Sequence, residues 1–213
     1  MNNPVLQIYQ ILHQHYGDLK WWPAQTPYEV MVGAILTQNT NWSNVEKAIA
    51  NFPQLSPEFV QKCELSQLKE IIYPAGFFNQ KAVYLKEMTE WFAGYNFCVH
   101  KVQQEPLAKI RKELLSVKGI GRETADSILL YALSYPSFVI DAYTQRLCRR
   151  YMLDVGNGYE LLKAYFENHL PTNAQLYNNY HALIVMLAKD YCRKSKPLCS
   201  ECPLEQQCEK HGL

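Results

Sequence analysis

Hydrophobic residues recur along most of the chain at intervals of three and four positions, which is the spacing of one face of an α-helix. Val5, Ile8 and Leu12 follow this spacing near the N-terminus, and the segment after Pro106 repeats it. Alternating apolar and polar runs bounded by turn dipeptides, which would indicate β-strands, are nearly absent. The pattern therefore predicts an all-α fold.

Helix-start signals divide this pattern into segments. Asn3 precedes Pro4, and Thr26, Pro27 and Glu29 form a capping box with a proline in the first turn. Four further helices are expected to start at a second capping box at residues 43–46, at Ser56, at Ser66 and after Pro106. The remaining helices are expected over residues 80–92, 124–135, 158–170 and 174–191.

Composition narrows the class of protein. The 213 residues are 48% apolar and 19% charged, which is typical of a chain with a buried core and not of a disordered one. No apolar run approaches the roughly 20 residues that a membrane helix needs. The N-terminus lacks the basic region and cleavage site of a signal peptide, so we expect a cytoplasmic protein without a membrane partner.

The formal net charge of +1 argues against a polyanionic partner, but the charges are unevenly distributed. Residues 1–100 carry 6 basic and 8 acidic side chains, whereas residues 101–200 carry 14 and 9. The second stretch could present a positive face to a nucleic acid. Alternatively, its charges are solvated ones on unrelated helix surfaces.

Two helical patterns over residues 114–133 are joined by a short turn at residues 117–121. Gly119 and Gly121 allow the backbone to turn tightly, and Gly121 leads into a helix whose free N–H groups suit a phosphate. Lys118 and Arg122 flank the turn. Any tight helix–helix turn favours glycine, but the basic neighbours favour a phosphate-binding hairpin.

The seven cysteines fall into two groups. Four lie close together near the C-terminus: Cys192, Cys199, Cys202 and Cys208. Four thiolates in a short segment can ligate one metal centre, and their spacing alone does not separate tetrahedral zinc from iron–sulfur. Three are scattered and are expected to be buried small hydrophobic side chains: Cys63, Cys98 and Cys148.

The hairpin and three other segments resemble the endonuclease III superfamily of DNA glycosylases. FVIDAYTQRL at residues 138–147 is similar to the family's second signature, in which an Asp follows a short apolar run. GFFNQKA at residues 76–82 and LTQNTN at residues 36–41 match two further segments. The four segments have the order of the family, and the resemblance extends from about residue 20 to the last cysteine.

This resemblance implies two all-α lobes with the active site in the cleft between them. Residues 22–133 would form a helical barrel that ends in the hairpin, and residues 1–21 with 134–213 would form the second lobe. The C-terminal cysteines would hold a 4Fe–4S cluster, with zinc as the alternative.

The implied partner is double-stranded DNA that contains a damaged base, bound by a monomer. By resemblance, the hairpin anchors phosphates, and in the family its carbonyls often also hold a monovalent cation. The cluster loop contacts DNA in this family, and here it carries Arg193, Lys194 and Lys196. These three charges could also simply solvate a surface loop.

Two acidic residues bear on the chemistry. By resemblance, Asp141 is the carboxylate that stabilises the oxocarbenium-like sugar or activates water, although it also suits the N-cap of the following helix. Glu123 occupies the position where bifunctional members carry the lysine that forms a Schiff base with the sugar. A carboxylate cannot form an imine, so the resemblance predicts a monofunctional enzyme without lyase activity. An acid in the first turn of a helix is also favourable for structural reasons alone.

Trp21, Trp22 and Pro23, followed by LTQNTN and taken together with VIDAYT at residues 139–144, resemble one branch of the superfamily, the bacterial 3-methyladenine glycosylases. Electron-rich indoles bind a cationic alkylated purine by stacking and cation–π attraction, although a tryptophan pair also suits ordinary core packing. Unlike the best-characterised members of that branch, this chain carries the cluster cysteines.

Three further residues take roles from the same resemblance. Gln38 would enter the gap left by the flipped nucleotide, or else lie at a solvent-facing helix end. Lys189 and Glu123 would border the base pocket, although a surface position is the default for a lysine.

The sequence as a whole predicts a monofunctional DNA glycosylase of base excision repair, with an alkylated purine such as 3-methyladenine as substrate. Two alternatives stay open. One is a glycosylase for mismatched thymine, uracil or an oxidised pyrimidine, and the other is a DNA-binding protein without catalysis.

Overall fold

The computed structural model describes residues 3–19, 22–153, 155–156 and 158–212. Over these residues the chain is helical and forms no strand, which confirms the all-α expectation for this part of the protein. The chain divides into two compact units, residues 1–23 with 136–213 and residues 24–135. No helix among the described residues is long and apolar enough to cross a lipid bilayer.

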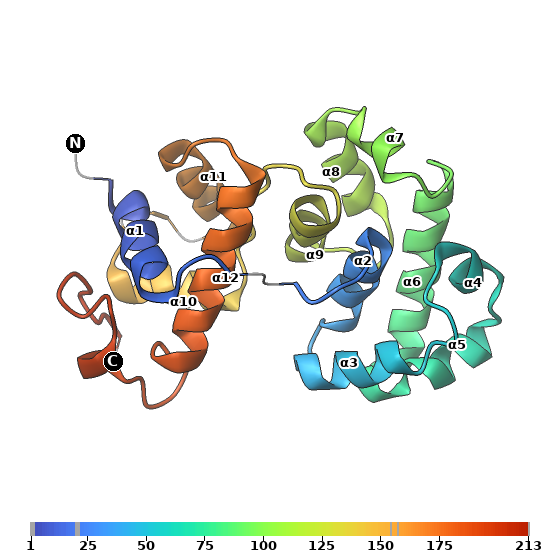
Figure 1. Cartoon of the computed structure of the whole chain (residues 1–213), viewed down its shortest axis with the longest axis horizontal. Helices are drawn as coiled ribbons and strands as arrows, with labels where there is room; N and C mark the ends of the chain where they lie inside the picture. The colour runs from blue at the N-terminus through green and yellow to red at the C-terminus, as the bar shows by residue number, and fades with distance from the viewer. Residues whose placement is uncertain (1–2, 20–21, 154, 157, 213) are drawn as a thin grey trace. The chain divides into compact units, whose positions relative to one another are not determined.

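The unit of residues 24–135 is built around α2, which spans Pro27–Leu36. The Thr26 side chain accepts a hydrogen bond from the Glu29 amide and caps this helix, as the sequence predicts. All but two residues of α2 are buried, because α3, α6, α9 and the π-helical segment η2 pack around it (Figure 1). The elements of this unit after α2 are α3 (Trp42–Ala50), α4 (Pro57–Lys62), α5 (Leu65–Ile71), η1 (Tyr73–Ala75), α6 (Phe78–Ala93), α7 (Val99–Gln103), α8 (Leu107–Ser116), α9 (Arg122–Ser127) and η2 (Ile128–Ala132).

Several expected helix starts in this unit are wrong. The helix α3 begins before the proposed box at residues 43–46, because the Asn41 side chain accepts from the Asn44 amide and serves as the cap. Similarly, α5 begins at Leu65 and not at Ser66, and it has no side-chain cap. The predicted helix over residues 124–135 begins earlier, at Arg122, and widens into a π-helix from Ile128. The short helix α7 was not predicted.

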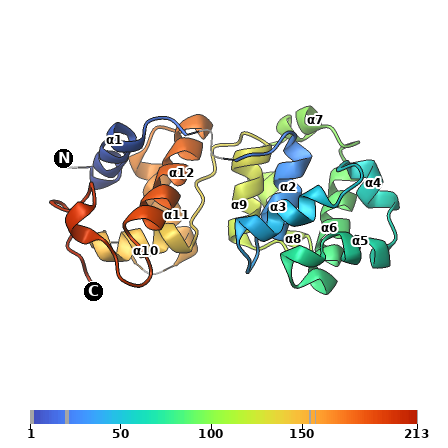
Figure 2. The same cartoon turned by 60° about the horizontal axis from the view of Figure 1, so that its bottom comes forward.

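The unit of residues 1–23 and 136–213 contains α1 (Pro4–Tyr16), α10 (Ala142–Tyr151), α11 (Tyr159–His169), α12 (Ala174–Asp190) and the short turn η3 (Cys199–Glu201). Within it, α12 packs along both α1 and α10 (Figures 1 and 2). The Tyr180 hydroxyl donates to the Val5 carbonyl at 2.7 Å and joins α12 to α1. Stacked rings of Phe138 and Phe166, with centroids 4.4 Å apart, fill the core beneath α11.

Candidate functional site: a hairpin and a buried carboxylate

The turn between α8 and α9 requires glycine at one position. Gly119 has φ 87°, and a Cβ atom built there would lie 2.1 Å from Cγ of Tyr84. Ile120 is buried and anchors the turn, whereas Gly121 has room for a side chain and an extended φ of −86°. Only the first of the two glycines is therefore demanded by the fold.

Charged groups around this turn divide into buried and exposed ones. Asp126 on α9 is fully buried and accepts two hydrogen bonds from Arg111 on α8, at 2.9 and 3.0 Å, so the two helices of the hairpin are joined by a bidentate ion pair. Lys118 and Arg122 are exposed on either side of the turn. Both cations therefore lie on the surface of the hairpin, where positive charge favours a polyanion.

Gln38 lies directly after α2 and is half-buried against the hairpin. Its Nε2 donates to the Gly119 carbonyl and to the Thr124 hydroxyl, both at 3.0 Å. The side chain therefore does not lie at a solvent-facing helix end. To enter the gap left by a flipped nucleotide it would have to give up both bonds, and that role stays a prediction.

Glu123 lies in the first turn of α9, next to Arg122, and is exposed. Its backbone carbonyl accepts from the Ser127 hydroxyl at 2.7 Å. Its negative charge is favourable at the N-terminus of this helix, and its correspondence to a Schiff-base lysine stays a prediction.

Asp141 is the N-cap of α10, and the residue is 8% exposed. Oδ1 accepts from the Thr144 amide at 2.7 Å and from the Thr144 hydroxyl at 3.0 Å, while Oδ2 lies 3.4 Å from Nε2 of His181. Burial raises the pKa of this carboxyl, but the charge of His181 and the bonds from Thr144 outweigh burial and hold the pKa below its ordinary value. The group is therefore kept ionised although it is buried.

His181 is a candidate site residue that the sequence reasoning missed. It lies on α12 and is 6% exposed. A sign of it was present in the sequence, because it is the polar residue that opens the apolar run at residues 182–188. Its partner could not be read from the sequence, since Asp141 belongs to a different helix.

The expected base-pocket residues are less tightly built into the fold. Trp21 lies outside the described residues. Trp22 is half-buried and Pro23 is exposed. Lys189 is an exposed residue near the end of α12, and its carbonyl accepts from Nε of Arg193 at 3.2 Å.

The four C-terminal cysteines are free thiols, half-buried, and all line one hollow. Apolar side chains from α10 and α12 complete this hollow, and Nη1 of Arg150 lies 3.3 Å from Sγ of Cys192. In the part of the chain that is described, no three cysteine, histidine or carboxylate side chains converge as the ligands of a metal ion do. The four thiols match the donors of a thiolate-bound metal or cluster in their chemistry, and they line the same hollow without converging as ligands do.

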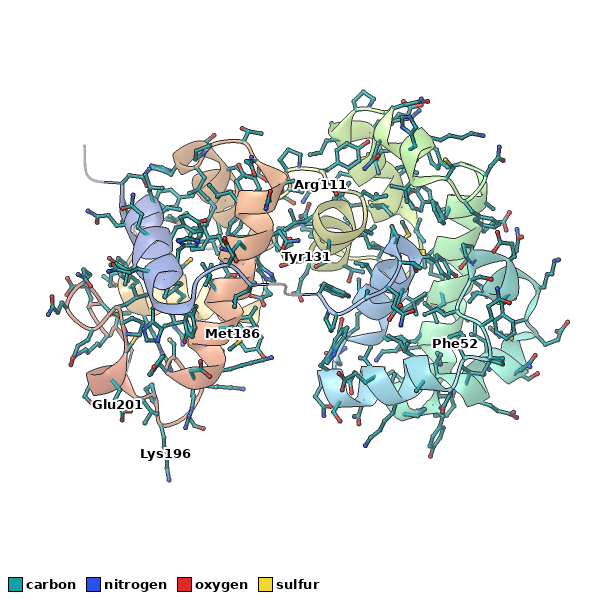
Figure 3. All side chains as sticks on the ribbon, viewed as in Figure 1. Phe52, Arg111, Tyr131, Met186, Lys196 and Glu201 are labelled. Carbon is teal, nitrogen blue, oxygen red and sulfur yellow. The ribbon has the colours of Figure 1, made fainter. Side chains whose placement is uncertain are left out.

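The loop between Cys192 and Cys199 displays its cations. Arg193, Lys194 and Lys196 are all exposed, and Lys196 points outward from the loop (Figure 3). The guanidinium of Arg150 donates to the backbone carbonyls of Arg193 and Lys194 at 2.7 and 3.3 Å. The backbone of the loop is thus tied to α10 while its side chains face solvent.

The three scattered cysteines only partly follow expectation. Cys63 and Cys148 are buried, but Cys98 is half-buried at the start of α7, so its assignment as a buried residue was wrong. Burial raises the pKa of the Cys148 thiol to about 12, which keeps it a neutral, unreactive side chain.

Phe77 is a second residue that sequence reasoning missed. It precedes α6 in a left-handed conformation, with φ 47°, and is 61% exposed. A bulky residue in this conformation is strained, and an exposed aromatic ring is free to stack on a base. The strained backbone and the exposed ring together point to a surface that meets a ligand.

An all-α chain with a glycine hairpin flanked by cations, followed by a buried and ionised Asp at a helix N-cap, has the organisation of a helix-hairpin-helix DNA repair protein. The family comparison agrees with this class. A sequence model of the HhH-GPD superfamily of base excision DNA repair proteins matches residues 32–172, and the chain belongs to this family.

Individual relatives give the same result. The chain is 46% identical over 211 residues to a Methanocaldococcus jannaschii protein whose name assigns it to the DNA repair glycosylases, covering 96% of this chain and 95% of that one. It is 25% identical to the endonuclease III of Sulfolobus acidocaldarius, covering 85% and 81% of the two chains.

Solved structures share the fold. A 3-methyladenine DNA glycosylase of H. pylori, bound to 1,N6-ethenoadenine, superposes with a TM-score of 0.74 at 28% identity, covering 87% of this chain and 97% of the other. A trapped endonuclease III–DNA intermediate superposes with a TM-score of 0.83 at 18% identity, covering 99% and 97%, and this likeness concerns the fold alone.

Proposed function

We propose that this protein is a monofunctional DNA glycosylase that hydrolyses the N-glycosyl bond of an alkylated purine. The observation that carries the proposal is Asp141, a buried carboxylate kept ionised by Thr144 and His181 in a chain of the HhH-GPD family. Such a group can stabilise the positive charge that develops on the sugar as the bond breaks.

The proposed reaction is a displacement by water. The electron pair of the glycosyl bond leaves with the base, and a water oxygen bonds to C1′ of the sugar and releases a proton. An alkylated purine is cationic before cleavage and neutral afterwards, so no general acid is needed to protonate the leaving group. Asp141 is thereby sufficient as the catalytic residue.

The residue at position 123 supports hydrolysis without strand cleavage. A Schiff base requires an amine near the sugar, and Glu123 offers a carboxylate at the corresponding place in the hairpin. We therefore propose that lyase chemistry by this route is absent.

The choice of an alkylated purine rests on two observations. One is the 28% identity to the H. pylori enzyme, which is named a 3-methyladenine glycosylase. The other is the sequence Trp21-Trp22-Pro23, whose indoles suit a cationic base. The second candidate is release of a mismatched pyrimidine, which is favoured by 25% identity over 206 residues to a thymine-DNA glycosylase of Aeropyrum pernix.

DNA binding is proposed to use two positive surfaces on a monomer. The hairpin offers Lys118 and Arg122 beside open backbone N–H groups, and its carbonyls are a place for a monovalent cation. The cysteine loop offers the three cations between Cys192 and Cys199. Affinity should fall steeply with salt if both surfaces meet phosphates.

We further propose that the four C-terminal cysteines hold a 4Fe–4S cluster, with zinc as the alternative. When bound, the cluster or metal would cross-link the C-terminal end of the chain, and it would take no part in the reaction. Arg150 would donate to one ligand sulfur and support the loop backbone, as it does in the structure described. Brown colour and iron bound to the purified protein would favour the cluster, and a colourless zinc protein the alternative.

The experiment that tests the function is base release from matched duplexes. Each carries one of 3-methyladenine, 7-methylguanine, thymine glycol or a G·T mismatch, and both free base and strand cleavage are measured. We expect release of the alkylated purines without cleavage. Release of thymine alone would support the second candidate, cleavage at thymine glycol would contradict the interpretation of Glu123, and no release from any duplex would favour a DNA-binding protein without catalysis.

A further inference from the structure

A buried lysine joins two segments of the 24–135 unit that are distant in sequence. Lys81 lies in the first turn of α6 and is 2% exposed. Its Nζ donates to the carbonyl of Leu36 and to that of Ala75, both at 2.8 Å. Leu36 is the last residue of α2 and Ala75 the last residue of η1, so one ammonium group satisfies the carbonyls of two helix ends.

Among the residues that the structure describes, the hydrogen-bond partners of this ammonium are carbonyls and not carboxylates. Burial alone lowers the pKa of Lys81 to about 8, so the ammonium is compensated by backbone carbonyl dipoles and not by an acid. An ion buried in this way costs free energy of desolvation, and an apolar side chain would avoid that cost only by leaving both carbonyls without their donor. The arrangement therefore indicates a task other than filling the core.

Each of the two carbonyls shortly precedes a residue of the candidate site. Leu36 is followed closely by Gln38, which contacts the hairpin, and Ala75 is followed closely by the exposed Phe77. The Phe77 ring itself lies 6.0 Å from Nζ of Lys81. A single nitrogen thus holds the start of two segments. One carries Gln38, the candidate for filling the gap in the duplex, and the other carries the exposed ring of Phe77.

We propose that Lys81 is a positioning residue that holds the Gln38 segment and the Phe77 turn in one fixed arrangement, so that both can enter a distorted duplex at the same point. The inference depends on the proposed function only in its second part, the entry of the two segments into a duplex. The arrangement of the two segments is a property of the protein alone and can be tested without DNA. A glycosylase must unstack a nucleotide and fill the gap that it leaves. Two segments that are already held together lose less conformational entropy on binding DNA than two independent loops.

Lys81→Met keeps the length of the side chain and removes every donor. Both carbonyls are then left buried without their partner, which should loosen the two segments. Thr89→Val is the matched control, because Thr89 on α6 shares a 2.6 Å hydrogen bond with the Tyr28 hydroxyl of α2. The control breaks a buried polar link between the same two helices at a place distant in sequence from both segments.

Hydrogen exchange read by mass spectrometry measures the arrangement directly. In Lys81→Met, amides over residues 37–41 and 75–80 should exchange about tenfold faster or more, while α8 keeps its protection. Thr89→Val should leave both segments unchanged even where its melting temperature falls. Unchanged exchange in Lys81→Met, or faster exchange in one segment only, would overturn the inference. If Lys81→Met fails to fold, Lys81→Gln takes its place. The glutamine side chain keeps two N–H donors but is shorter, and we expect the same changes in exchange.

Binding to two duplexes connects the arrangement to function. Dissociation constants are measured at one salt concentration for an undamaged duplex and for one with a tetrahydrofuran abasic analogue. We expect Lys81→Met to lose about tenfold of the wild-type preference for the analogue, with undamaged-duplex affinity and the preference of Thr89→Val both retained. A full preference in Lys81→Met would contradict the inference. A wild-type protein without any preference would instead contradict the proposed function, and the exchange result would still decide the role of Lys81.

Discussion

Replacing Asp141 by Asn separates its structural role from its chemical one. An asparagine side-chain oxygen can accept the same two bonds from Thr144, and Asn and Asp are equally good N-caps. The Nδ2 amide of the asparagine would face His181 where Oδ2 of Asp141 does now, so that neighbour keeps a polar group beside it. The free energy of unfolding should therefore change by about 1 kcal/mol or less.

The rate of base release should change far more. A carboxylate about 4 Å from a positive charge, at an effective dielectric constant of about 20, stabilises it by about 4 kcal/mol. Loss of that stabilisation in the transition state slows the reaction by about a thousandfold. A buried group is the case in which such an effect is strongest, and Asp141 is 8% exposed.

The assay is single-turnover release of the alkylated base from a duplex, with the melting temperature and the dissociation constant for the abasic-analogue duplex measured on the same sample. We expect unchanged melting, equal or tighter DNA binding and a rate about a thousandfold lower. A rate within about tenfold of wild type, with normal folding and binding, would refute the assignment of Asp141 as the catalytic residue.

Three further predictions concern the supporting residues. Gly119→Ala should lower the free energy of unfolding by about 2 kcal/mol or more, because the new Cβ would meet Tyr84 at a position with positive φ. In the same thermal melt Gly121→Ala should be nearly neutral, and equal effects of the two changes would contradict this account. His181→Asn should raise the pKa of the catalytic carboxyl, since burial is then less opposed, and shift the acid limb of the rate–pH profile to higher pH; an unmoved limb would contradict the pairing. Cys202→Ser should abolish iron binding and visible absorbance while the wild type shows both, and a zinc-loaded, colourless wild type would contradict the cluster.

Local signals in the sequence were sufficient for much of the fold. Thr26 and Ser56 cap their helices as predicted, because a cap is a contact between residues three positions apart. The same signals misplaced the starts of α3 and α5, because a polar residue suited to a cap does not always provide one, and α5 has no side-chain cap. At α3 the cap is Asn41, earlier than the box expected from Ser43.

The sequence by itself determined the helical class, the glycine turn and the position of Asp141 before a helix, since each depends on spacing along the chain. It did not determine what surrounds them. His181 meets Asp141 only because α12 packs along α10, and Gln38 meets the hairpin only because α2 packs against α9. Contacts of this kind join residues far apart in sequence, so only the tertiary structure decided that the buried carboxylate stays ionised and that a single ammonium binds two helix ends.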